Sequence, residues 1–196
     1  MSRFDSEVVL DDPLFVADSA ELYGRIHLAA GVSVWPNVVI RAEMHTVEIG
    51  EGSNLQDFVM VHVGNETGTH VGRNCSITHR VTLHGCRIGD HCLIGINATV
   101  MDGVEVGENS IVAGHSFLPA GRQYPANSII AGVPGKVIRE RNNFIANGIN
   151  AYIYRLNAQA YAQGRYRAWA EPEMERRIEE ERQRLAAILA RQEAMA

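Results

Sequence analysis

The stretch TLHGCRIGDHCLIGINATV, residues 82–100, decides the fold. Its aliphatic residues Leu83, Ile88, Ile94 and Val100 follow one another at intervals of five, six and six residues. An amphipathic helix would show a period of about 3.6 residues, and a half-buried strand a period of about two. A period of six matches neither of them and indicates a hexapeptide repeat, which is typical of a solenoid.

The same period extends over most of the chain. A small residue often stands four positions after the aliphatic one, as Cys92 and Ala98 do. The aliphatic positions that keep the phase are Val16, Leu22, Leu28, Val34, Ile40, Ile49, Leu55, Val61, Val71, Ile77, Leu83, Ile88, Ile94, Val100, Val106, Val112 and Leu118. This regularity argues against chance spacing of aliphatic residues in an ordinary β-domain.

We predict an all-β solenoid over residues 10–140, in which each hexapeptide forms a short strand and a turn. Three hexapeptides close one triangular coil of about eighteen residues, the aliphatic side chains point inward, and neighbouring coils bury each other's edges. Successive coils lie about 4.8 Å apart, the spacing of hydrogen-bonded strands. Three residues are inserted between Ile40 and Ile49, and four more around 64–68, where we expect a loop at a coil corner.

The end of the chain has a different character. From residue 141 to 196, asparagine, alanine, tyrosine and arginine replace the glycine and valine of the repeat. Pro172 marks the first turn of a final helix, in which Ile178, Leu185 and Leu189 share a face. We predict a C-terminal helical tail that packs on the β-helix or on a neighbouring subunit. Its apolar contacts are expected from Tyr152, Tyr154, Tyr161, Tyr166 and Trp169.

The composition limits the function classes. The chain of 196 residues has a formal net charge of −5, which argues against a nucleic-acid-binding surface. It contains no run of eighteen apolar residues, and the acidic N-terminal segment lacks the apolar region of a signal peptide. The three cysteines form no CxxC motif, so neither a disulfide framework nor a cysteine zinc site is predicted. We expect a cytoplasmic protein with no nucleic-acid and no membrane partner.

Two of the eight histidines fall into the same register of the repeat. His62 follows Val61 directly and His84 follows Leu83 directly, and three repeats, one full coil, separate them. They are therefore predicted to stack on one face about 4.8 Å apart, close enough for both imidazoles to bind one metal ion. Arg41, one coil earlier, continues this column.

His79 occupies a different position, two residues after Ile77, and its neighbour one coil earlier is Asp57. This pair is predicted on the adjoining face of the prism, so a site with three histidines forms only across a subunit boundary. Triangular prisms associate naturally about a threefold axis. Three imidazoles leave an open coordination position for water, which is the arrangement of a catalytic metal site rather than a structural one.

Other candidate residues receive a structural interpretation. The remaining histidines are interpreted as hydrogen-bonding groups on the solenoid surface, with His70 in the 61–71 segment as the one that can reach the cleft. Cys86 and Cys92 are interpreted as buried small residues rather than metal ligands. The dense charge of residues 171–184 is interpreted as a solvated helix face.

Several motifs carry a family resemblance. They are Ile40-Arg41-Ala42-Glu43, Asn54-Leu55-Gln56-Asp57, Val61-His62-Val63, His79 followed by Leu83-His84-Gly85-Cys86, Gly95-Ile96-Asn97-Ala98 and Met101-Asp102-Gly103. Together they resemble the γ-class carbonic anhydrases, and within them the bacterial PaaY/CaiE-like subgroup. The resemblance covers residues 10–140 and is specific in its combination of motifs.

This resemblance implies a left-handed parallel β-helix that forms a homotrimer with a metal ion at each subunit interface. In such a trimer, His62 and His84 are similar to the ligands from one subunit, and His79 is similar to the ligand from its neighbour. The implied metal is Zn²⁺, and the ligand set also permits Fe²⁺ or Co²⁺.

The resemblance also implies roles for residues around the metal. Gln56 is similar to the residue that orients bound water or bicarbonate, and Arg41 and Asp57 are similar to an ion pair across the interface. The family commonly has Arg-Gly-Asp where this chain has Arg-Ala-Glu, so Glu43 keeps the carboxylate on a longer side chain. Its proton-shuttling acidic loop is short here, and Glu66 is the only acid in it, so proton export is expected to limit hydration.

We therefore expect a trimeric metalloenzyme of the γ-carbonic anhydrase type, which hydrates CO₂ reversibly to bicarbonate by a metal-bound hydroxide. Glu66 or His70 would move protons. Two alternatives stay open. An acyl-CoA thioesterase of the PaaY type would use the same interface site, and a non-catalytic scaffold would use the metal only to clamp subunits together. The hexapeptide fold also hosts acyltransferases, but the register of three histidines argues against that class.

Overall fold

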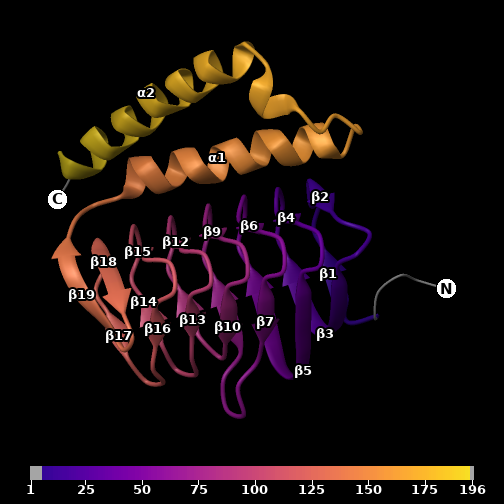
Figure 1. Cartoon of the computed structure of the whole chain (residues 1–196), viewed down its shortest axis with the longest axis vertical. Coiled ribbons are helices and arrows are strands. Elements are labelled where there is room, and N and C mark those ends of the chain that lie inside the picture. The colour runs from indigo at the N-terminus through magenta and orange to yellow at the C-terminus, as the bar shows by residue number, and fades with distance from the viewer. Residues whose placement is uncertain (1–5, 195–196) are drawn as a thin grey trace.

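Short strands follow one another at the period of the repeat along residues 6–194, the part of the chain that the computed structural model describes (Figure 1). One sheet has eight strands, and the other has eleven. The smaller sheet contains β2 (Phe15–Val16), β4 (Ser33–Val34), β6 (Asn54–Leu55), β9 (Ser76–Ile77), β12 (Leu93–Ile94), β15 (Ile111–Val112), β18 (Ser128–Gly132) and β19 (Gly135–Glu140). The larger sheet contains β1 (Val8–Leu10), β3 (Glu21–Leu28), β5 (Val39–Ile49), β7 (Met60–His62), β8 (Thr69–Val71), β10 (Thr82–His84), β11 (Arg87–Ile88), β13 (Thr99–Val100), β14 (Glu105–Val106), β16 (Phe117–Leu118) and β17 (Gln123–Tyr124).

The larger sheet bends around one corner of the coil and so provides two faces. Its turning point is β5, which pairs with β7 through residues 39–41 and with β8 through residues 47–49. We call the face made by β7, β10, β13 and β16 the His62 face, and the face made by β8, β11, β14 and β17 the His70 face. The smaller sheet is the third, helix-covered face. The predicted β-solenoid with C-terminal helices is confirmed.

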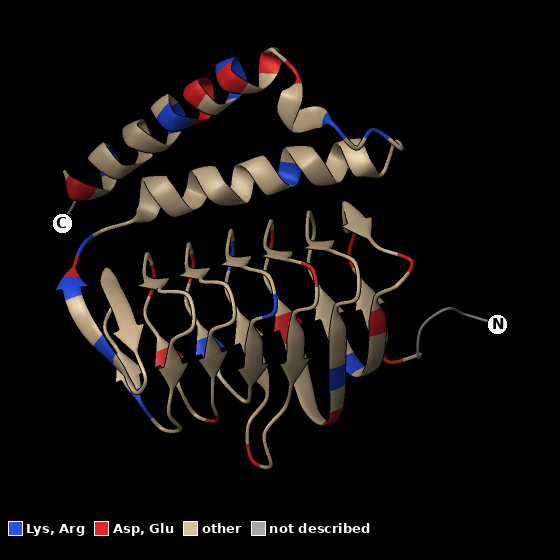
Figure 2. Cartoon of the chain, in the orientation of Figure 1, with Lys and Arg blue, Asp and Glu red and all other residues tan. Residues whose placement is uncertain are grey.

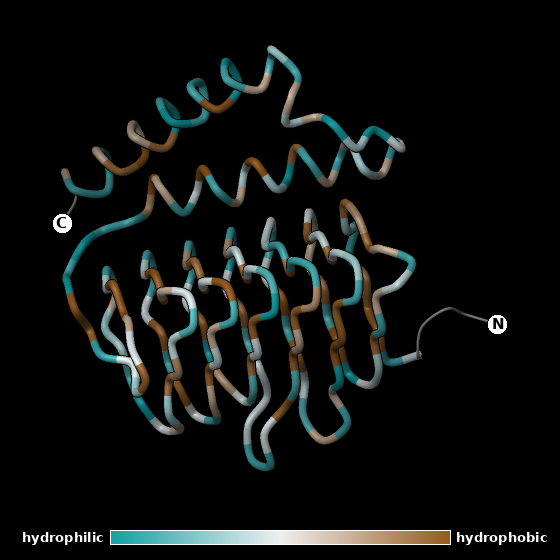
Figure 3. The backbone as a smooth tube through the Cα atoms, in the orientation of Figure 1, coloured by the Kyte–Doolittle hydropathy of each residue, from teal (hydrophilic) through white to brown (hydrophobic). Residues whose placement is uncertain are grey.

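The repeat produces the fold by filling the axis of the coil. All but one of the phased aliphatic residues are at most 2 % exposed, and Val16, in the first coil, is partly buried. Hydrophobic segments accordingly recur from coil to coil along the solenoid in Figure 3. Each strand before β19 stacks in parallel register on the strand one coil away, as Leu55 does on Ile77, so inward positions superpose from coil to coil.

The two insertions have different structures. The predicted loop at 64–68 lies at the corner between β7 and β8, and Gly64 donates a backbone hydrogen bond to the Thr67 carbonyl (2.8 Å). The residues inserted between Ile40 and Ile49 form no loop. They lengthen β5 into one continuous strand of eleven residues, and Ala42 and Val47 are buried within it.

The helical tail lies along the helix-covered face (Figure 1). Helix α1 (Phe144–Tyr161) contacts β2, β4, β6 and β9, and helix α2 (Glu173–Glu193) packs on α1 after the short 3₁₀ turn η1 (Ala168–Ala170). Pro172 immediately precedes α2. Neither helix of the described region is long and apolar enough to cross a membrane.

Apolar and polar contacts fix α1 to the solenoid. The Trp35 ring lies 4.8 Å from that of Tyr161 and 5.6 Å from that of Tyr154 between centroids, and aromatic residues bury much apolar area. The amide nitrogen of Asn147 donates to the carbonyl groups of His91 (2.8 Å) and Ser110 (3.0 Å). Helix α1 is therefore docked on the smaller sheet by specific aromatic contacts and hydrogen bonds.

Helix α2 is amphipathic, with one side facing α1 and the other facing solvent. Ile178, Leu185 and Leu189 face the α1 side, with Leu185 buried near Phe144. The opposite side carries most of the tail's charge, whereas α1 carries Arg155 alone (Figure 2). The charged stretch is thus a solvated face, as predicted.

Candidate metal centre

The predicted column on the His62 face is confirmed. Arg41 of β5 pairs with His62 of β7, and His62 pairs in register with His84 of β10. Because adjacent parallel strands superpose side chains of the same orientation, both imidazoles stand on the outer surface, each roughly a quarter exposed. Nδ1 of His62 lies 3.0 Å from Nε2 of His84.

Each of these two rings turns its other nitrogen to a carboxylate. Nε2 of His62 lies 3.1 Å from Oε2 of Glu43, and Nδ1 of His84 lies 2.9 Å from Oδ1 of Asp102. An ionised carboxylate only accepts hydrogen bonds, so these outer nitrogens carry the protons of the neutral rings. In this pair of tautomers both facing nitrogens carry lone pairs, an arrangement that a proton or a metal cation between them would stabilise.

The spacing also suits a metal ion. Two nitrogens bound at about 2.0–2.1 Å to a tetrahedral Zn²⁺ ion lie about 3.3 Å apart, close to the 3.0 Å between His62 and His84. Metal-binding histidines usually donate their second N–H to a carboxylate or carbonyl oxygen. The donor set of this pair therefore fits a divalent cation of the Zn²⁺, Fe²⁺ or Co²⁺ type.

His79 lies at the corner between the helix-covered face and the His62 face. Its Nδ1 is 3.1 Å from Oδ2 of Asp57, the predicted neighbour, and its Nε2 is 3.4 Å from the Tyr154 hydroxyl of α1. Burial raises the pKa of Tyr154 to about 12, so this hydroxyl stays protonated. Within the described residues, no three His, Cys, Asp or Glu side chains of one chain gather closely enough to hold a metal ion.

Gln56 is buried on the helix-covered face, next in sequence to Asp57. Its amide nitrogen donates to Oδ1 of Asn54 (3.0 Å), and the Asn54 amide donates to Ser76 Oγ (3.0 Å) and to the carbonyl of Cys75 (3.2 Å). This network holds Gln56 rigidly on the His79 side of the molecule. Gln56, Asp57 and His79 thus lie together at this corner, apart from the His62 and His84 pair.

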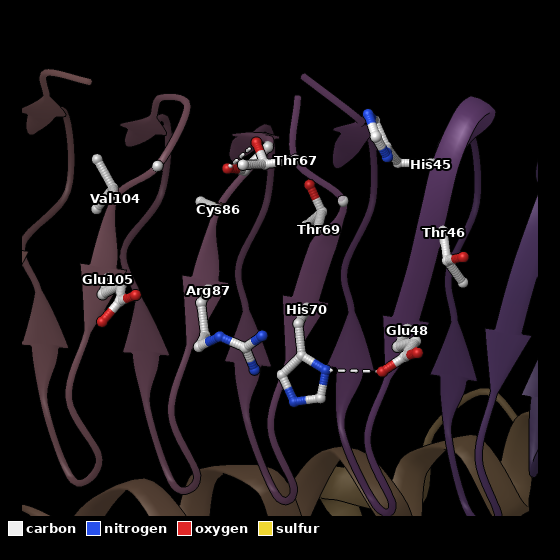
Figure 4. Close-up of a pocket in the computed structure, with 13 residues that line it drawn as sticks. His45, Thr46, Glu48, Thr67, Thr69, His70, Cys86, Arg87, Val104 and Glu105 are labelled. Atoms are coloured by element: carbon white, nitrogen blue, oxygen red, sulfur yellow. Dashed lines mark hydrogen bonds and ion pairs between the residues drawn. The ribbon is translucent and has the colours of Figure 1, made fainter. Parts of the chain in front are cut away.

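The structure separates the two candidate proton carriers. Glu66 shares a groove with His84 and Asp102. His70 faces a different groove of about 420 Å³ on the His70 face, where its Nδ1 lies 3.0 Å from Oε2 of Glu48 (Figure 4). Glu66 therefore lies on the side of His84, and His70 belongs to another surface.

Arg41 already has a partner within its own chain, because its guanidinium donates to Oε1 of Glu43 (2.5 Å). Glu43 so connects Arg41 with His62. A hydrogen bond from its own backbone amide holds the pKa of Glu43 below its usual range. Desolvation acts in the opposite direction, and Arg41 and His62 add to the lowering. Burial raises the pKa of the Cys86 thiol to about 12, which makes it inert as a ligand at neutral pH.

Sequence reasoning quoted Asp102 as part of a motif but gave it no role, and it did not connect Tyr154 with His79. Counting repeats pairs His84 with Met101, one position away from Asp102, so register alone does not bring this carboxylate to the ring. Tyr154 belongs to a helix outside the repeat. The only available indication of Asp102 and Tyr154 was a general rule: a metal-binding imidazole usually forms a hydrogen bond through its second ring nitrogen.

Comparison with known proteins first defines the class. Residues 85–120 match the family model described as "Bacterial transferase hexapeptide (six repeats)". The crystal structure of a hexapeptide transferase family protein from Anaplasma phagocytophilum is similar, with a TM-score of 0.72 and 29 % sequence identity, and covers 80 % of this chain and 92 % of that one. The fold is that of the hexapeptide-repeat proteins.

Sequence relatives then narrow the class to a family. A protein of Methanocaldococcus jannaschii named "Probable carbonic anhydrase" is 46 % identical over 125 residues, which are 64 % of this chain and 79 % of that protein. The Arabidopsis thaliana protein "Gamma carbonic anhydrase 1, mitochondrial" is 40 % identical over 110 residues, 53 % of this chain. The match spans only 40 % of that plant protein's length. The chain belongs to the hexapeptide-repeat γ-carbonic anhydrase family.

Proposed function

We propose that this chain is a γ-type carbonic anhydrase, which hydrates CO₂ reversibly to bicarbonate as a homotrimer. A divalent cation, Zn²⁺ or alternatively Fe²⁺ or Co²⁺, would be held by His62 and His84 of one subunit and His79 of the next. The observation that carries the proposal is the pair of lone-pair nitrogens 3.0 Å apart, whose other ring nitrogens face Glu43 and Asp102.

Exposed apolar side chains on both halves of the site support their meeting in a trimer. Phe58 and Ile96 are about half exposed at the corner that carries His79. Tyr23 and Phe117 are exposed on the His62 face. Apolar groups in such positions mark protein interaction surfaces, and a corner of one prism can pack on the face of the next around a threefold axis.

When bound, a divalent cation with three imidazole ligands acidifies water at its open position and so supplies a nucleophile for CO₂ at neutral pH. Gln56, fixed by Asn54, would orient the reacting oxygen through its amide group. Arg41 of one subunit would form an ion pair with Asp57 of the next. This ion pair would connect Glu43, bound to Arg41, with His79, bound to Asp57. Glu66 would accept the released proton at its carboxylate and pass it to solvent.

The decisive experiment uses subunits that complement each other. His79→Ala chains keep the His62 and His84 pair, and His84→Ala chains keep His79, so neither forms a complete site alone. Unfolding and refolding the two variants together gives mixed trimers, in which one interface in three combines an intact pair with an intact His79. We expect Zn²⁺ binding and CO₂ hydration to return only in the mixture, measured by elemental analysis and stopped-flow pH change.

Three results would overturn the proposal. Zn²⁺ binding by a monomer, or by each variant alone, would show that the metal site is not shared between subunits. A metal-loaded trimer that hydrates no CO₂ but hydrolyses acyl-CoA, with loss of hydrolysis in His84→Ala, would assign the thioesterase activity instead. A trimer without either activity that dissociates when metal is stripped would be a scaffold, and in it Gln56→Ala would change nothing.

A further inference from the structure

We propose that Asp102 is a positioning residue for His84, and that the inserted loop at 64–68 is present to hold it. This inference rests on the proposed metal function. Asp102 follows β13 by two residues, and its Oδ1 reaches back to Nδ1 of His84 at 2.9 Å. The contact keeps the ring proton on Nδ1 and leaves the lone pair of Nε2 directed at His62.

The carboxylate of Asp102 rests in a cradle between two glycines. A Cβ atom placed on Gly64 would lie 2.0 Å from Asp102 Oδ1, and a Cβ atom on Gly85 would lie 2.5 Å from the same oxygen. Both distances are shorter than real Cβ contacts. A larger residue at either position would therefore push the carboxylate away from the His84 ring, so the cradle needs glycine at both.

The loop that supplies Gly64 is itself bonded to the strands of both histidines. The hydroxyl of Thr67, within the loop, donates to the carbonyl of Gly85 (2.9 Å), directly after His84. The hydroxyl of Thr69, the residue of β8 that directly follows the loop, donates to the carbonyl of His62 (2.6 Å). These bonds fix the loop against the two coils. The inserted loop thus fixes the position of the Asp102 carboxylate, which in turn orients the His84 ring.

Positioning matters here because the ring is exposed. His84 is 29 % exposed and Asp102 is 39 % exposed, so packing alone does not fix the imidazole. A free imidazole in water favours the proton on Nε2, which would remove the lone pair from the nitrogen that faces His62. Removing the carboxylate partner of a metal-binding histidine typically costs about 10–100-fold in metal affinity.

Three variants test the inference. Asp102→Ala removes the acceptor, whereas Asp102→Asn keeps an acceptor oxygen of the same reach without the charge. Gly64→Ala leaves both Asp102 and His84 unchanged in chemistry but fills the cradle. Its nearest neighbours would be the side-chain atoms Asp102 Oδ1 and Thr67 Oγ1 (2.9 Å) rather than backbone, so the fold should persist. Gly85 is unsuitable because its φ of +57° adds backbone strain.

Two readouts are measured on each full-length protein. The first is the tautomer of His84 in the metal-free protein, from ¹⁵N–¹H correlations of the imidazole, assigned by comparison with His84→Ala. The second is the Zn²⁺ dissociation constant from competition with a chelator. We expect wild type and Asp102→Asn to keep the proton on Nδ1. Asp102→Ala and Gly64→Ala should both shift it to Nε2 and weaken Zn²⁺ binding about 10–100-fold.

Asp90→Ala is the matched control. Asp90 lies over Gly72 as Asp102 lies over Gly64, with its Oδ1 2.5 Å from a Cβ placed on Gly72, but it bonds Arg73 (2.7 Å) instead of a histidine ring. We expect this variant to lose stability while the His84 tautomer and the Zn²⁺ affinity stay at wild-type values.

The outcomes separate this inference from the proposed function. An unchanged tautomer and unchanged Zn²⁺ affinity in Asp102→Ala would overturn the role of Asp102 while the metal site stands. An Asn variant that keeps the proton on Nδ1 but binds Zn²⁺ as weakly as the alanine variant would also overturn it, because charge rather than the hydrogen bond would then be responsible. A tautomer shift in a protein whose wild type binds no Zn²⁺ would support the positioning and refute the metal function.

Discussion

His62 and His84 lie one coil apart with Nδ1 of the first 3.0 Å from Nε2 of the second, and each ring is held from outside by a carboxylate of a different strand or turn. Two neutral rings oriented in this way present lone pairs to each other. The arrangement is therefore unfavourable by itself and becomes favourable with a positive charge between the rings. The carboxylates of Glu43 and Asp102, which orient the two rings, are therefore as important to test by substitution as the histidines.

The first prediction concerns Glu43, which bonds both Arg41 and His62. Glu43→Ala should weaken Zn²⁺ binding about 10–100-fold, because His62 loses the partner that fixes its ring. Chelator competition measures the change. Glu48→Ala is the control, since Glu48 is also a β5 glutamate bonded to a histidine, His70, but on the other face. Equal losses in both variants would contradict the assignment.

The second prediction concerns proton export. Glu66→Gln should lower kcat for CO₂ hydration in dilute buffer, on the order of 10²-fold if Glu66 is the main proton carrier. The ratio kcat/KM should stay nearly constant, and added imidazole buffer should restore kcat. His70→Gln should have little effect, because His70 lines the groove on the His70 face. The reverse pattern would make His70 the carrier.

The third prediction concerns His91, which is partly buried and lies 4.5 Å from the Phe144 ring between centroids. Burial lowers the pKa of His91, with Asp90 opposing and Arg73 and Arg184 adding to the effect. The unfolded chain then binds the proton more readily. Stability should therefore be fully present above about pH 6.5 and decline as the pH falls below it.

His91→Asn tests this linkage. Asn74, Asn109 and Asn127 hold the equivalent corners with φ between +51° and +59°, so asparagine suits the left-handed backbone of His91. We expect the loss in free energy of unfolding between about pH 7.5 and about pH 5.5 to be smaller in the variant, measured by denaturant titration. An identical loss in both proteins would show that His91 does not contribute.

The fourth prediction concerns the docking of α1. Trp35→Ala should destabilise the protein by about 3–5 kcal/mol, because the buried indole packs on Phe15, Tyr154 and Tyr161. Trp169→Ala is the control, since that ring is more than half exposed, and its effect should stay within about 0.5 kcal/mol. Comparable losses would mean that the aromatic cluster does not anchor the helix.

The sequence predicted the solenoid and the neighbouring positions of several candidate residues, because in a fixed repeat the number of residues between two positions determines whether they stack. Leu55 stacks on Ile77, so Asp57 and His79 fall next to each other, and the same counting aligns His62 with His84. The roles of Gln56, Arg41, Asp57 and Glu66, and the division into 10–140 and 141–196, stay predictions.

What counting could not supply depends on side-chain reach and on residues outside the repeat. The contact between Asp102 and His84 bridges positions that differ by one step in register. The continuity of β5 as one strand around the corner follows from Ala42 and Val47 being buried, which a three-residue slip does not reveal. The approach of Tyr154 to His79 requires the docked position of α1, which only the three-dimensional packing defines.

The last two strands of the solenoid have a consequence for solubility. Among the described strands, β18 and β19 alone pair antiparallel, and β19 places Lys136 and Arg139 on the outermost edge of the smaller sheet. These two positive charges oppose the addition of a strand from a second molecule at that edge. The charged hairpin thus disfavours end-to-end growth into fibres through the smaller sheet.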